Sequence, residues 1–426
     1  MAQHILPIEL WLVIFELATA CPEEWEFGGI ERSMTFWGRS PNTIDRWEDV
    51  LKTRRSLVAI SRFFNQLTTP LLYQSFFAIT PGQVSRFSRT LQTRPALGGY
   101  IKRLGLSPQL KPNVNAYYPR ILESCPNVHF CDTELRLSDA RQPPSLRSLE
   151  LYVTPEFRDE SSDPEFLHLL ARILQATPQL EHLGVYWLPY RIKVTNSRPL
   201  ADIRLGSLRS LHLRVCAPWQ PCLDGVVPAI LLLFSLNLPR LEHLLLEDTD
   251  MVGEVLNRIP ASWLRQISQF SVTYDFIARC SLGPDHFALL RKFTLDLSCV
   301  AHYSWGQQPH QTLPFTRLEH IELFHCATPI SIEYHPGYDA LQSILGFCAD
   351  ATATPNLRFL TMDIAELEER RRLFSTKIVW KRLNELQAVV TLIHDRGIDP
   401  KGLHSSALLP AVQTLVRNAR TWVLEP

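Results

Sequence analysis

One pattern of apolar positions repeats along most of this chain. An apolar residue, two variable residues, an apolar residue, one variable residue and an apolar residue form a phrase, as in Leu146–Leu151 and Leu208–Leu213. Copies begin at positions 101, 146, 180, 208, 241, 267, 290, 318 and 357, and a degenerate copy fits at Val128 and Cys131. Alternating apolar residues predict a half-buried strand, and repetition of one short unit predicts a stacked architecture.

The segments between the phrases predict helices and turns. Helix-like stretches cover 166–176, 229–236 and 341–349. Turns at Pro178, Pro239 and Pro355 come directly before copies of the phrase. Strand, connecting helix, proline turn and strand is the order typical of an irregular leucine-rich repeat solenoid. We therefore expect an α/β fold in which residues 81–365 form the solenoid.

Residues 1–80 predict a separate helical unit. A first helix covers 6–20, with Pro7 suited to its first turn. The polar, tryptophan-rich stretch at about 21–50 predicts a long loop or insertion. A second helix is expected from about 50 to 68, stopped by Pro70.

Residues 366–426 predict a helical cap, because a stack of repeats must cover its last apolar face. A charged helix over 366–396 ends at the sequence Asp395-Arg-Gly397, and a last helix follows at 408–422.

The phrase also predicts which side chains face the core. Its three apolar positions point inward, and the positions between them alternate outward. The outward third position gives the row Arg103, Ser148, His182, Ser210, His243, Gln269, Lys292, His320 and Phe359. The ninth position turns the chain and holds Thr154, Cys216, Thr249, Asp275, Ser298 and Cys326 in six of the nine copies.

The outward positions are the candidate binding face for a protein substrate. We expect its contacts from five residues at the strand ends: Tyr152, Tyr186, Trp187, Arg214 and Glu247. Concave solenoid faces commonly hold partners, and aromatic residues dominate interface energetics. The alternative is that these residues only decorate a solvated strand face.

Charge and cysteine content limit the cellular compartments and the kinds of partner that the sequence predicts. The chain has 43 basic and 43 acidic residues, so its net charge predicts neither a nucleic-acid partner nor a membrane surface. Its 9 cysteines include no Cys-x-x-Cys pair, which favours reduced thiols and an intracellular, cytoplasmic or nuclear protein. We find no signal peptide and no apolar run long enough to span a bilayer.

The motif search gives no catalytic, cofactor or metal site. Nucleophile elbows, phosphate loops and dinucleotide turns are absent from the sequence. His182, His243 and His320 share the phrase Leu-Glu-His but come from repeats that are not adjacent, so we expect them to be too far apart for one zinc ion. A protein without catalytic activity is the expectation.

The N-terminal residues resemble an F-box. The stretch from Leu6 to Leu17 reads LPIELWLVIFEL, close to the opening of that motif, and 57–67 reads LVAISRFFNQL, close to its second part. The insertion at about 21–50 separates halves that are normally almost contiguous. The whole layout resembles fungal F-box proteins with divergent leucine-rich repeats.

The resemblance implies a substrate-recognition subunit of a cullin-based (SCF-type) ubiquitin ligase. Such a protein docks on a Skp-type adaptor through its F-box. The residues carried over to this contact are Leu6, Pro7, Leu10, Ile14, Phe15, Leu57, Ile60 and Phe64. The alternatives are that these residues cap the first repeat, and that the chain is a leucine-rich-repeat interaction scaffold without a ligase.

Overall fold

A computed structural model describes the parts of the chain that carry most of the repeats. The described residues are 6–19, 41–78, 80–106, 117–134, 143, 145–153, 163–188, 200, 203–215, 233–247, 258–273, 287–296, 315–324, 344–346, 348–352, 354–362 and 387–402. The chain divides into two compact units, the first holding Met1–Cys216 and Gln220–Arg240, the second Ala217–Trp219 and Leu241–Pro426. Among the described residues, no helix has the length and apolar character needed to cross a bilayer.

The first unit begins with three helices. They are α1 (Ile8–Ala18), α2 (Pro41–Ile60) and α3 (Arg62–Tyr73). The first helix confirms the prediction, with Pro7 as its N-cap residue. The prediction of a loop is wrong for residues 41–50, which form the first half of α2. The remainder of the predicted insertion, 21–40, lies outside the described residues.

The predicted second helix is in fact two helices that meet at Ser61. Ser61 is extended, and its hydroxyl accepts a hydrogen bond from the backbone N–H of Phe64, which caps α3. Pro70 lies inside α3 and does not stop it. Only one turn follows Pro70, so little of the helix depends on the hydrogen bond that proline cannot make.

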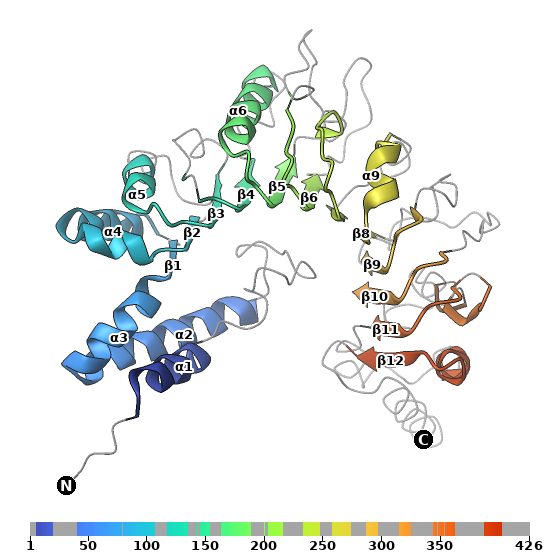
Figure 1. Cartoon of the computed structure of the whole chain (residues 1–426), viewed down its shortest axis with the longest axis horizontal. Helices are drawn as coiled ribbons and strands as arrows, with labels where there is room; N and C mark the ends of the chain where they lie inside the picture. The colour runs from blue at the N-terminus through green and yellow to red at the C-terminus, as the bar shows by residue number, and fades with distance from the viewer. Residues whose placement is uncertain are drawn as a thin grey trace, which may run out of the picture. The chain divides into compact units, whose positions relative to one another are not determined.

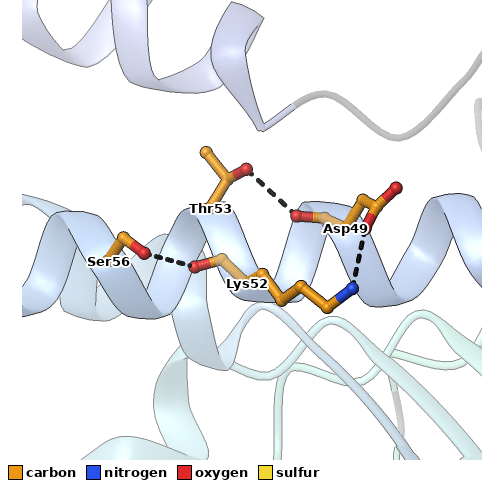
Figure 2. Close-up of polar contacts among 4 residues, drawn as sticks. All are labelled: Asp49, Lys52, Thr53 and Ser56. Carbon is orange, nitrogen blue, oxygen red and sulfur yellow. Dashed lines mark hydrogen bonds and ion pairs between the residues drawn. The ribbon is translucent and has the colours of Figure 1, made fainter.

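The exposed side of α2 is polar (Figure 2). Lys52 Nζ lies 2.9 Å from Asp49 Oδ1, and both side chains are largely exposed. The hydroxyls of Thr53 and Ser56 donate to backbone carbonyls four residues earlier. An exposed pair of this kind contributes little stability, and hydroxyl bonds to the preceding turn do not favour helix over coil.

Six parallel strands follow one another in the first unit. They are β1 (Ser75–Ala78), β2 (Arg103–Leu106), β3 (Phe130–Glu134), β4 (Ser148–Tyr152), β5 (His182–Leu188) and β6 (Ser210–Val215). The strands from β1 to β5 each pair in parallel with the next strand of the chain. This order confirms the predicted repeats, including the degenerate copy, which forms β3.

Helical segments connect these strands, as parallel pairing requires. They are α4 (Pro81–Thr93), the 3₁₀ helix η4 (Pro95–Tyr100), α5 (Tyr118–Ser124) and α6 (Asp163–Ala176). In Figure 1, α4, α5 and α6 lie on one side of the strands. A capping box opens α4, because Thr80 and Gln83 each bond the other's backbone N–H.

The second unit repeats the arrangement with six more strands. They are β7 (His243–Glu247), β8 (Gln269–Thr273), β9 (Lys292–Asp296), β10 (His320–Phe324), β11 (Phe359–Met362) and β12 (Asp399–Gly402). They pair in parallel in chain order, and the short helix α9 (Ala261–Gln266) precedes β8. The turns at Pro178, Pro239 and Pro355 are present as predicted.

The final described strand is joined by a helix over 387–395 that ends where the sequence predicted. Gly397 has φ 77°, and the N–H of Ile398 donates to the carbonyl of Ile393, 3.4 Å away. This is a Schellman-type end, which glycine favours. Arg396 donates to the carbonyls of Cys348 and Thr354, so the helix is tied to the turn before β11. In β12, Pro400 pairs in register with Leu360 of β11.

The apolar positions of the phrase form the core of each unit. Leu149, Leu183 and Leu211 stand at one repeat position on neighbouring strands, and none is exposed to solvent. The same holds in the second unit for Leu246, whereas its neighbour Leu245 is half-buried. The inward and outward assignment of the phrase is therefore confirmed at these positions.

Replacing Leu246 with alanine should lower the free energy of unfolding by about 2–5 kcal/mol, because it leaves a cavity among fully buried side chains. The matched change Leu245→Ala, one residue earlier on the other face, should cost about 1 kcal/mol or less. Urea unfolding followed by circular dichroism measures both. Equal losses would contradict the register.

Candidate functional site

The first candidate site is an apolar surface on α1. Leu6, Leu10, Val13, Ile14 and Leu17 recur at helical spacing on one side of this segment, and we call them the α1 face. All five are exposed; Leu10 is 49% and Leu17 74% exposed. Exposed apolar residues on one side of a helix are typical of interaction surfaces, which makes the α1 face a candidate site.

The opposite side of α1 packs inside the helical unit. The ring of Phe15 is 3% exposed and lies 5.5 Å from that of Trp11. The Phe64 ring of α3 contacts both, with centroids 5.1 Å from each. These edge-on contacts hold α1 against α3 and leave the α1 face pointing away.

A buried arginine fixes the end of α1. Arg54 of α2 is 5% exposed, and its Nη2 donates to the carbonyl of Thr19 at 3.0 Å. Thr19 follows the last residue of α1, where carbonyls lack partners within the helix and a positive charge is favourable. Arg54 therefore links the two halves of the helical unit across the chain segment that separates them.

The predicted adaptor-binding residues fall into three groups by exposure. Leu6, Pro7, Leu10, Ile14 and Ile60 are exposed, and Leu57 and Phe64 are half-buried. Phe15 is buried and serves the helical core in this structure. The role of these residues in binding an adaptor stays a prediction.

The second candidate site is the strand face of each unit, formed by the outward positions of the repeats. In the first unit, Tyr152 and Tyr186 stack with ring centroids 5.3 Å apart. The hydroxyl of Tyr186 lies 2.9 Å from Nδ1 of His212. Gly184 makes room for this arrangement, since a Cβ at that position would come within 2.7 Å of the Tyr186 hydroxyl.

A polar cluster crosses the neighbouring strands of the first unit. Nδ1 of His182 lies 2.9 Å from the hydroxyl of Ser210, and its Nε2 lies 3.6 Å from Oε1 of Glu150. The order of acid, imidazole and hydroxyl is that of a hydrolytic triad. Ser210 is only 4% exposed, however, so its hydroxyl is closed to a substrate and the cluster is a structural network.

The strand face of the second unit contains a buried ion pair. Nζ of Lys292 lies 3.0 Å from Oε2 of Glu322, and the two side chains are 7% and 9% exposed. Thr294 and His320 also approach this carboxylate, and His320 bonds the hydroxyl of Thr361 at 2.9 Å. At the end of this face, Phe359 remains exposed.

These contacts count against the alternative that the outward side chains only decorate a solvated strand face. Side chains on adjacent parallel strands, about 4.8 Å apart, cover one another. Tyr152 is 1% and Tyr186 3% exposed, so both rings lie at the predicted repeat position but pack against neighbours. The register shifts between Val185 and Leu188, so the predicted row from Tyr186 to Arg214 is interrupted by an irregularity.

The remaining predicted substrate residues are only partly described. Arg214 is half-buried on β6. The side chains of Trp187 and Glu247, and the predicted turn residues at the ninth position, lie outside the described residues. Substrate binding by these five positions stays a prediction. Three residues of the strand faces were not among the predicted site residues: Glu150, His212 and Glu322. They share the fifth repeat position, which the alternation of the phrase also places outward.

The described cysteines are structural. Cys125, Cys131 and Cys348 are free and buried. Burial raises the pKa of each to about 12, so these thiols stay protonated at neutral pH. The Cys131 sulfur lies 3.0 Å from the Tyr118 hydroxyl, whose pKa burial also raises. Within the described part of the chain, no group of three or more His, Cys, Asp and Glu residues is arranged to hold a metal ion.

Comparison with known proteins finds distant likenesses among solved structures. No protein-family model and no curated protein sequence matches the chain. Among solved structures, the chain is similar to LegL7, a leucine-rich repeat-containing protein from Legionella pneumophila. The two share 11% identity and a TM-score of 0.38, over 83% of this chain and 98% of that one. A likeness this low assigns no function.

Replacing Arg54 with methionine should loosen α1 by removing a buried, charge-assisted hydrogen bond, whose loss costs about 1.5–3 kcal/mol. Hydrogen exchange at the amides of α1 should speed up by about tenfold or more. Its neighbour Arg55 is exposed, so Arg55→Met is the matched control and should leave exchange unchanged. Identical exchange in the two variants would rule out the link.

Replacing Glu322 with glutamine should destabilise the second unit by about 3 kcal/mol, because it removes the carboxylate charge that lies 3.0 Å from the buried ammonium of Lys292. Glu319→Gln, at an exposed position just before β10, should change stability by about 0.5 kcal/mol or less. Urea unfolding measures the difference. A stable Glu322→Gln variant would show that the pair adds nothing.

Proposed function

We propose that this protein is a substrate receptor of a cullin-based ubiquitin ligase, docking on a Skp-type adaptor through the α1 face. The F-box-like sequence from Leu6 to Leu17 supports the proposal. The observation that carries it is the two-sided use of this segment. Phe15 and Trp11 stabilise the helical unit from within, while Leu10, Ile14 and Leu17 are presented to solvent.

Energetics favour a partner on this surface. A buried leucine or isoleucine contributes about 1.5–3 kcal/mol relative to an exposed one, so the five residues of the α1 face offer several kcal/mol to any protein that covers them. Short helical units also bury little surface alone and gain stability from a partner.

The strand faces would receive the substrate in this proposal. They belong to sheets whose short strands are fixed by buried leucines, so a partner meets a rigid surface. The receptor would contribute binding and orientation, and ubiquitin transfer would belong to other subunits.

One observation favours a second candidate, a repeat scaffold without a ligase. The helix α3 contacts η4 and leads directly into β1, so the helical unit also closes the first repeat. A structural cap needs no adaptor. The two candidates separate on whether the exposed side of α1 binds an adaptor.

Replacing Leu10 with aspartate should abolish binding to a purified Skp-type adaptor, because it places a charge at the centre of the α1 face while leaving the Phe15 core intact. Co-purification and calorimetry with the full chain measure the complex. The matched control is Leu392→Asp, an exposed leucine (57%) on the helix over 387–395, which should bind normally. A folded wild-type chain that fails to bind the adaptor would favour the scaffold.

A further inference from the structure

A row of titratable residues, three of them exposed cations, runs along the start of the strands in the first unit. It consists of Lys102, His129, Arg147, Glu181 and Arg209, each one residue before the third repeat position. From His129 onward, the backbone N–H of each residue donates to the carbonyl of the preceding member, at 2.7–2.9 Å. The five residues are therefore held in register on adjacent strands, and we call them the basic row.

The basic row carries uncompensated positive charge. Lys102, Arg147 and Arg209 are exposed, and Glu181 is its single acid. Nη1 of Arg147 lies 3.0 Å from Oε1 of Glu181. Across the described residues, neither Lys102 nor Arg209 has an ion-pair partner. Partial burial lowers the pKa of His129, and the charges of Arg147 and Lys102 lower it further. The second effect is the one expected from a positive electrostatic potential along the row.

The corresponding row of the second unit provides a contrast. Glu242, Ser268, Arg291, Glu319 and Arg358 stand at the same repeat position and are also joined by backbone hydrogen bonds. This row contains two acids and two bases, so its charges balance. The excess of cations is thus a property of the first unit and not of the repeat position.

The spacing of the cations suits an extended chain. Lys102, Arg147 and Arg209 stand on every second strand, about 10 Å apart at about 4.8 Å per strand. An extended peptide rises about 3.3 Å per residue, so acids at every third position match this spacing. About six residues span the whole row.

A protein segment fits this surface better than a nucleic acid. Single-stranded nucleic acids are held by exposed aromatic rings as well as by positive charge. On the adjacent strand face, Tyr152 and Tyr186 are buried, so their rings are closed to bases. Glu181 in the middle of the row opposes a continuous phosphate backbone, and the net charge of the chain is zero.

We propose that the basic row binds an extended, carboxylate-rich segment of a partner protein. The inference rests on the proposed function only in naming that partner as the substrate. Binding would come from charge complementarity along the row, with Lys102 and Arg209 free to pair with side chains of the segment.

The test uses the full chain and a nine-residue fluorescent peptide with glutamate at every third position and proline and serine between. Fluorescence anisotropy in 50 mM salt should show binding. Binding should weaken at least about tenfold in the double variant Lys102→Glu/Arg209→Glu, and for a peptide with glutamine in place of glutamate. The variant Arg291→Glu/Arg358→Glu makes the same change of charge in the balanced row and should bind as wild type.

Three results would overturn the proposal. The peptide could fail to bind the wild type, it could bind both double variants equally, or a single-stranded RNA of equal charge could bind more tightly through the same two residues. Circular dichroism melts check that both double variants fold, and Lys102→Gln/Arg209→Gln gives a milder test. Retained adaptor binding by Lys102→Glu/Arg209→Glu separates this site from the α1 face.

Discussion

Parallel pairing between neighbouring short strands is the constraint on which each unit depends. A strand of four to seven residues has no stable fold alone, and its apolar side chains are buried only when the next repeat covers them. The leucines of the phrase meet this need because they stand at equal positions on successive strands. Every other feature of the strand faces, including the charged row, inherits its spacing from this pairing.

The same constraint explains why the strand faces are so little exposed. Stacking at about 4.8 Å brings large outward side chains into contact with one another. Tyr152, Tyr186 and His212 form one packed group, and Lys292 and Glu322 form another. Hydrogen-bonded polar groups such as the Tyr186 hydroxyl and Nδ1 of His212 rigidify a surface and specify the alignment of its strands. Among the described residues, the exposed charges and apolar side chains considered above lie mainly at the strand starts and on α1.

Sequence reasoning predicted the repeats because their signal is redundant. The phrase of alternating apolar residues located ten strands, among them β3 from only Val128 and Cys131. It missed β1 and β12. One of the two inward positions of β1 holds the small residue Ala78, and those of β12 hold Pro400 and Gly402 in place of large apolar residues. Gly397 was predictable as a helix end because a left-handed residue is needed there.

Features set by distant contacts were not predictable in the same way. The break between α2 and α3 at Ser61 depends on one hydrogen bond, in which the Ser61 hydroxyl caps α3. The apolar spacing on both sides of Ser61 is that of a continuous helix. The burial of Arg54 depends on a carbonyl 35 residues earlier, and the burial of the tyrosines depends on which side chains neighbouring repeats supply. For the candidate sites, the apolar side of α1 was predictable from the spacing of its residues along a helix. The balance of charge in the row at the strand starts of each unit was not, because it depends on the register between strands.

Pro400 has a consequence for the outer edge of β12, the last strand that the structure describes. In these parallel ladders the third repeat position directs its N–H to the preceding strand, so the backbone nitrogen at the fourth position points the other way. In β12 that position is Pro400, which has no N–H to offer. A further strand arriving beyond β12 would find a missing donor at its centre. A proline at this position therefore disfavours the pairing of a further strand along the outer edge of β12, the last strand among the described residues.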